Sequence, residues 1–99
     1  MIEHVVLFKW KPDASRLAID AAAAALKGLA DRIPGIVDLS CGPPITDQPQ
    51  QYSFGLVVRF KDRPSFEAYG PHPAHVEVVQ TYLLPIMAEA LNFDFEKAI

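Results

Sequence analysis

The stretch that decides the fold is the opening one, Ile2-Glu3-His4-Val5-Val6-Leu7-Phe8-Lys9-Trp10, in which side chains alternate between two faces. One face carries Ile2, His4, Val6, Phe8 and Trp10, and the other carries Glu3, Val5, Leu7 and Lys9. A period of two residues predicts a β-strand. Because both faces contain apolar side chains, we expect both faces of this strand to be covered.

A helix is predicted directly after this strand. Lys11-Pro12 ends the strand, and Asp13 offers a cap for the first turn. Apolar side chains then recur at helical spacing, at Ile19, Ala22, Leu26, Leu29 and Ile33. Pro34-Gly35 ends the helix, since proline and glycine interrupt regular structure.

The rest of the chain repeats this pattern with two more strands and then more helix. A short strand is predicted over residues 36–41, a loop over 42–51, and a second alternating strand over 52–61. Asp62-Arg63-Pro64 opens a short helix that runs through Tyr69. Another helix starts at Pro73 and ends or bends at Pro85, and a fourth strand is predicted from the alternation of Leu91, Phe93 and Phe95.

The predicted order is strand, helix, strand, strand, helix, strand, within one domain that spans residues 1–99. This order is typical of an α+β fold in which helices cover one face of a four-stranded antiparallel sheet. Val5, Leu7 and Val57 would then lie on a bare face. A 99-residue chain whose one cysteine, Cys41, excludes an internal disulfide has a marginal core. We therefore expect a homodimer in which two sheets cover each other.

Charge and hydropathy exclude several classes of partner. The formal net charge is −3 and the cations are scattered, so nucleic acid is not an expected ligand. The start of the chain lacks the pattern of a secretion signal, and no apolar run approaches the roughly 20 residues that span a bilayer. A cytoplasmic location is the resulting expectation.

The candidate site is the stretch Tyr69-Gly70-Pro71-His72-Pro73-Ala74-His75-Val76. From His75, the positions Val79, Tyr82 and Ile86 fall on one helical stripe, which predicts that His75 faces inward among apolar neighbours. Desolvation favours the neutral imidazole, which can accept a proton. His4 could enter the same cavity from the sheet, and we include Tyr69, His72, Val79 and Tyr82 among its candidate residues.

Each of these residues also has a structural interpretation. His72 precedes Pro73 and can cap a helix, while His75, His4 and Tyr69 can be packed and hydrogen-bonded core residues. His72 and His75, with His4 or a carboxylate as a third ligand, could instead form a metal site. The proline between the first two and the lack of a clear acidic partner argue against this alternative, so we expect no metal.

The sequence resembles a known family at three places. The opening Ile2-Glu3-His4-Val5-Val6-Leu7-Phe8-Lys9-Trp10, the segment Ile33-Pro34-Gly35, and Tyr69 followed by His72-Pro73-Ala74-His75-Val76 look like the stress-responsive A/B barrel domain, known as Dabb. The resemblance covers essentially the whole chain. It implies a ferredoxin-like fold that dimerises into an α/β barrel.

The resemblance also implies an activity. One member of the family, a plant polyketide cyclase that makes olivetolic acid, closes a linear polyketide by aldol condensation. Its catalytic histidine corresponds to His75, its catalytic tyrosine to Tyr69 and another pocket histidine to His4. If that chemistry transfers, His75 is a general base and Tyr69 donates a hydrogen bond to the substrate carbonyl, with no cofactor.

Three functions are therefore open. The first is a cofactor-free lyase, cyclase or isomerase that acts on an apolar carbonyl compound. The second is a stress-response or ligand-binding dimer without catalysis, in which His75 and Tyr69 orient a small molecule or stabilise the fold. The third is a cofactor-independent monooxygenase, because similar dimeric barrels include such enzymes. Fold alone does not decide between them.

Overall fold

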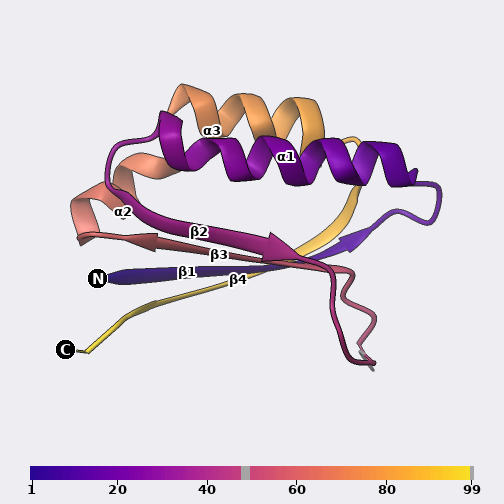
Figure 1. Cartoon of the computed structure of the whole chain (residues 1–99), viewed down its shortest axis with the longest axis horizontal. Helices are drawn as coiled ribbons and strands as arrows, with labels where there is room; N and C mark the ends of the chain where they lie inside the picture. The colour runs from indigo at the N-terminus through magenta and orange to yellow at the C-terminus, as the bar shows by residue number, and fades with distance from the viewer. Residues whose placement is uncertain (48–49, 99) are drawn as a thin grey trace.

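The computed structural model describes residues 1–47 and 50–98 and has two layers, a sheet with helices on one of its faces (Figure 1). The predicted order of strands and helices is confirmed. The elements are β1 (Ile2–Trp10), α1 (Arg16–Arg32), β2 (Ile36–Gly42), β3 (Phe54–Phe60), α2 (Arg63–Tyr69), α3 (Pro73–Val78), the π-helical turn η1 (Val79–Leu83) and β4 (Met87–Glu96).

The sheet is antiparallel, with the strand order β2-β3-β1-β4. β1 is central and turns Ile2, Val6 and Phe8 toward the helices, where they are buried. Its register places His4 opposite Val58 on β3 and opposite Asp94 on β4. The core lies between the sheet and the helices and includes Val6, Phe8, Leu26, Leu29, Leu56, Val58, Phe60 and Tyr69.

The first helix begins later than the sequence predicts. Asp13 was expected to cap it, but the cap is Ser15, whose hydroxyl accepts a hydrogen bond of 3.0 Å from the amide of Ala18. Asp13 instead lies in a turn that the Ala14 amide closes on the Lys11 carbonyl. The side-chain oxygen that reaches free amides of the first turn decides where a helix starts, and here that oxygen is the serine hydroxyl.

Two strand boundaries also differ from the expectation. β3 begins at Phe54 and leaves Tyr52 outside, and β4 begins at Met87, well before Leu91. Residues 87–90 contain no β-branched or aromatic side chain, so their sequence gives no strand signal. They are extended because they pair with the end of β1, where Trp10 lies opposite Met87 after an irregularity in the register.

The helix after Pro73 changes its winding at η1. The amide of Leu84 donates to the carbonyl of Val79 at 2.8 Å, five residues back, whereas an α-helix uses four. This wider turn moves the next residue round the axis. As a result Leu83 is buried against the sheet, while Tyr82 is 36% exposed.

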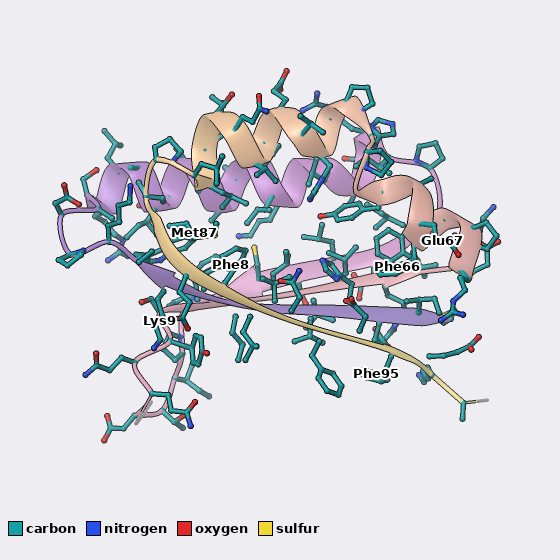
Figure 2. The ribbon with its side chains drawn as sticks, turned by 180° about the vertical axis from the view of Figure 1, so that it is seen from behind. Phe8, Lys9, Phe66, Glu67, Met87 and Phe95 are labelled. Carbon is teal, nitrogen blue, oxygen red and sulfur yellow. The ribbon has the colours of Figure 1, made fainter. Side chains whose placement is uncertain are left out.

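The second face of the sheet is apolar and uncovered in this chain. Figure 2 shows Phe95 on this face, while Phe8, Phe66 and Met87 lie on the helix side. Val57, Leu91, Phe93 and Phe95 are all exposed, and Phe93 is exposed by 67%. Near the start of the central strand β1, Glu3 is buried on this face and accepts a hydrogen bond of 2.9 Å from Arg59 Nε. Its second oxygen has no partner among the described residues.

Within residues 1–47 and 50–98, no helix has the length and apolarity that crossing a membrane requires.

Candidate functional site

The candidate site lies where α2 gives way to α3, over the first half of β1 (Figure 1). Asp62 caps α2 by accepting a hydrogen bond of 2.9 Å from the Ser65 amide, and Pro64 occupies the first turn. The helix ends at Tyr69, and after Gly70-Pro71 the chain restarts as α3. This break places Tyr69 and His75 side by side, with ring centroids 4.2 Å apart.

His75 has a defined tautomer. Its Nδ1 lies 3.0 Å from the carbonyl oxygen of Gly70, which can only accept, so Nδ1 carries the proton and donates it. In the neutral ring Nε2 is then left as a proton acceptor. Desolvation by burial, together with the charges of His4 and His72, lowers the pKa of His75, although the bond to Gly70 opposes this shift. The geometry therefore favours a neutral base.

Tyr69 is held as a proton donor. Its side chain is almost fully buried, and this burial raises its pKa to about 12. The phenol therefore keeps its proton at any physiological pH. Its hydroxyl makes no hydrogen bond to another described residue, so a substrate oxygen can accept that bond.

His4 approaches the same tyrosine from the sheet. The His4 and Tyr69 ring centroids are 5.7 Å apart, in an edge-to-face arrangement. His4 Nδ1 contacts the carboxylate of Asp94 on β4, which fixes the ring and its tautomer. Asp94 was not among the predicted site residues, and the expectation that the histidines lack a clear acidic partner is wrong. The alternation of β4 was visible, but only the pairing register places Asp94 opposite His4.

Two adjoining cavities meet at these side chains. One has a volume of about 170 Å³ and extends under the helices. The other, of about 320 Å³, lies beside α2 and includes Glu67 and Asp94 in its wall. Both are lined by His4, Tyr69, His75 and Asn92. The inner cavity is otherwise apolar, so a polar contact inside it has little competition from water.

The structure brings four of the six candidate residues together and leaves two apart. His4, Tyr69, His75 and Val79 line the inner cavity. Tyr82 does not line it, because the wide turn η1 brings Leu83 to that position. His72 does not either, because its Nδ1 accepts a hydrogen bond of 3.0 Å from the Ala74 amide and caps α3.

The three histidines do not converge on one point, since His72 faces a separate hollow with Ile33 and Ser65. Within the described parts of the chain, no group of three or more His, Cys, Asp or Glu side chains is placed to hold a metal ion. The carboxylate beside His4 therefore orients an imidazole and does not complete a ligand set.

Comparison with known proteins agrees with this architecture. The sequence is 30% identical over 96 residues to a stress-response A/B barrel domain-containing protein of Arabidopsis thaliana. That match covers 96% of this chain but only 36% of the plant protein, so this chain spans about a third of the length of that relative.

Two solved structures show the same fold. A dimeric ferredoxin-like protein from Jannaschia is 25% identical, with a TM-score of 0.80 over 97% of this chain and 98% of that one. The hydroxynitrile lyase of Passiflora edulis is 16% identical, with a TM-score of 0.85 over 95% of this chain and 90% of that one. The second likeness concerns the fold alone.

The family model described as Stress responsive A/B Barrel Domain matches residues 2–97. This match covers the strands and helices that form the candidate site. The chain therefore belongs to the stress responsive A/B barrel domain family, Dabb, and has its ferredoxin-like fold.

Proposed function

We propose that this protein is a cofactor-free acid–base catalyst that acts on a small apolar carbonyl compound. The observation that carries the proposal is the hydrogen bond from His75 Nδ1 to the Gly70 carbonyl, which leaves Nε2 as a base next to Tyr69. Base and donor lie on the wall of one apolar cavity. This pairing is what removal of a proton next to a carbonyl requires.

The first step is the removal of a proton from carbon. His75 Nε2 takes a proton from the carbon beside the carbonyl, and the electrons of that C–H bond move to the carbonyl oxygen. The Tyr69 hydroxyl donates a hydrogen bond to this oxygen as its negative charge develops. The resulting enolate either attacks a second carbonyl, as in ring closure, whose oxygen then takes the proton from His75, or it takes the proton back on carbon. In the reverse direction the same groups break a carbon–carbon bond.

A lyase in the same fold is consistent with this chemistry. The hydroxynitrile lyase of Passiflora edulis has the same fold, although its identity of 16% carries no residue role to this chain. The non-catalytic ligand-binding dimer and the monooxygenase are the alternatives. The acid–base proposal is favoured over them because a proton acceptor, His75 Nε2, and a phenol hydroxyl lie side by side on the wall of one apolar cavity.

The proposed functional unit is a homodimer. The exposed residues Leu91, Phe93 and Phe95 form an apolar ridge on the open face of the sheet, next to Val5 and Val57. Burying such a face stabilises a small domain whose one cysteine excludes an internal disulfide. The dimeric ferredoxin-like protein from Jannaschia supports this assembly.

The test is exchange of carbon-bound hydrogen. 2-Heptanone, an apolar methyl ketone, is incubated with the protein in deuterium oxide, and deuterium uptake next to the carbonyl is followed by proton NMR. We expect catalysed exchange in the wild type. Exchange should fall by a factor on the order of 10² to 10⁴ in His75→Ala, because the base is lost. It should fall by about 10² in Tyr69→Phe, because the enolate loses its donor.

Tyr82→Phe is the matched control, since it removes a phenol hydroxyl from the same helical region but outside the cavity. It should leave exchange unchanged. Equal exchange in wild type, His75→Ala and Tyr69→Phe would exclude the proposal. Binding of 2-heptanone without any exchange would favour the non-catalytic ligand-binding dimer.

A further inference from the structure

A second cleft lies at the opposite end of the sheet from the His75 site. We name it the α1 cleft. It has a volume of about 340 Å³ and lies between one side of α1 and the far ends of β1, β2 and β3. Trp10, Phe54, Ala23, Lys27 and Cys41 are among the residues that line it. Its volume falls in the range of about 300–1,000 Å³ typical of small-molecule sites, whereas the inner His75 cavity is smaller.

The floor of the α1 cleft is aromatic. Trp10 is half-buried, and Phe8 stacks on it with ring centroids 5.3 Å apart and planes 12° apart. Phe54 packs against the same indole at 5.4 Å with a tilt of 43°. Phe8 covers one side of the indole, so its exposed part is available to a flat apolar group. Stacking of this kind contributes about 0.5–1.5 kcal/mol beyond the area that it buries.

The wall that α1 contributes carries two cations and one carboxylate. Arg16, Asp20, Ala23 and Lys27 follow one another at three- and four-residue spacing and so share one side of the helix. Arg16 Nε forms an ion pair of 3.3 Å with Asp20, which offsets its charge. Lys27 has no ion-pair partner among the described residues. One positive charge above an aromatic floor therefore remains uncompensated.

These features select one class of ligand. A single uncompensated cation suits a monoanion better than a phosphate with two charges, and an aromatic floor suits a flat ring. Ala23 leaves space between the charge and the floor because its side chain is a single methyl group. We propose that the α1 cleft binds an aromatic carboxylate, with its ring on Trp10 and its carboxylate at Lys27.

This site does not depend on the His75 chemistry. Trp10 ends β1, whereas His4 and the Tyr69 ring that it contacts lie near the beginning of the strand (Figure 1). The inner cavity reaches along β1 as far as Phe8, which stacks on Trp10. The two lining sets share no residue. Binding in the α1 cleft can therefore be measured whether or not the protein exchanges protons on ketones.

The protein carries its own two reporters for the test. It has one tryptophan and one cysteine, Trp10 and Cys41, and both line the α1 cleft. Burial raises the pKa of the Cys41 thiol, while the nearby Lys27 opposes that shift, so alkylation is run in mildly alkaline buffer. The probe is 2-naphthoate, and 2-naphthamide is its neutral counterpart.

We expect 2-naphthoate to slow alkylation of Cys41 by N-ethylmaleimide and to shift the single indole N–H resonance of Trp10. The amide should bind about tenfold more weakly, and Lys27→Gln should weaken naphthoate binding by a similar factor while leaving amide binding unchanged. In Ala23→Leu, naphthoate should neither protect Cys41 nor shift the Trp10 resonance, because the leucine side chain fills the cleft. His75→Gln should leave naphthoate binding intact.

Lys97→Gln is the matched control for charge. Its backbone amide bonds to the carbonyl of Met1, at the other end of β1 from Trp10. It should bind naphthoate as the wild type does. No protection of Cys41 and no shift of Trp10 would overturn the proposal. Equal affinity for naphthoate and the amide, or equal affinity in Lys27→Gln and the wild type, would overturn it as well, because the cleft would then recognise no charge.

Discussion

At the scale of single residues, the neighbours of Tyr69 determine what it can do. The phenol lies between two imidazole rings, that of His75 on α3 and that of His4 on β1. Each ring is oriented by a hydrogen-bond acceptor at Nδ1, a backbone carbonyl for His75 and the Asp94 carboxylate for His4. Such partners fix tautomers before any substrate arrives, and this preorganisation lowers the cost of reaching the transition state.

The lowered pKa of His75 has a consequence for stability. In the unfolded chain the imidazole takes its ordinary pKa of 6.5, and in the folded chain the pKa is lower. Between these two values the unfolded state binds more protons, so acidification favours unfolding. The contribution of His75 to stability is therefore fully present above pH 6.5 and is lost as the pH falls toward the folded-state pKa.

We predict that the urea midpoint of the wild type falls more than that of His75→Gln between about pH 7.5 and about pH 5.5. The two proteins differ only at residue 75, so the difference between the two profiles isolates His75. Parallel profiles over this range would show that burial of His75 has no effect on its proton affinity.

The sequence predicted part of this site and missed the rest for identifiable reasons. The spacing of Tyr69 and His75 around Gly70-Pro71 was visible because both lie on one local stretch. Asp94 was missed because it meets His4 only through the strand register, which a single sequence does not specify. Tyr82 was wrongly assigned to the cavity because the prediction used 3.6 residues per turn through Val79–Leu83, where the helix has a wider π-helical turn.

At the scale of elements, the tightest constraint lies in the turn between α1 and β2. Gly35 has a positive φ of 92°, and its carbonyl accepts a hydrogen bond of 3.0 Å from the Lys61 amide. A methyl group at this position would overlap the side chain of Ser65 at the start of α2. This one residue therefore ties the end of α1 to the element that carries Tyr69.

We predict that Gly35→Ala lowers the free energy of unfolding by about 1–3 kcal/mol, through backbone strain together with the displacement of Ser65. Gly28→Ala is the matched control, because a methyl group there meets nothing within 4 Å inside α1. It should raise stability by about 0.5–1 kcal/mol. Urea denaturation of both variants gives the comparison, and equal effects of the two substitutions would contradict the role of Gly35.

The order of the elements could be predicted, but some of their boundaries could not. The alternation in β1 and the helical spacing in α1 could be recognised because buried positions carry apolar side chains. The start of α1 depended on whether Asp13 or Ser15 reached the free amides, and both residue types cap helices well. The start of β4 depended on pairing with β1, which overrode the weak local preference of residues 87–90.

At the scale of the whole molecule, the two faces of the sheet differ. The helix side is closed over the core, while Val57, Leu91, Phe93 and Phe95 leave the other side apolar and open. The ion pair of Glu3 with Arg59 is a polar group within this apolar face. In the proposed homodimer, this ion pair restricts how one sheet can lie on the other, because a different orientation would bury one of its charges away from the opposite charge.

We predict that Phe93→Lys converts the dimer into a monomer. Each copy loses a buried aromatic side chain worth about 1.5–3 kcal/mol, and the interface gains two like charges. Light scattering after size exclusion should show a mass of 10.9 kDa in place of twice 10.9 kDa. Leu17→Lys, at a residue 81% exposed on α1, is the matched control and should remain dimeric. A dimer of Phe93→Lys at micromolar concentration would place the interface elsewhere.

The wide turn η1 also determines which side chain stands in the cavity wall. A chain that lacked Leu83 would regain ordinary α-helical winding, and Tyr82, now outside, would take the place of Leu83 in the cavity wall. A phenol would then replace an aliphatic group without any substitution in the wall itself. Loss of one residue at this turn would therefore change which compounds fit the cavity. Relatives compared without a gap at this turn would have the wrong residues assigned to the cavity.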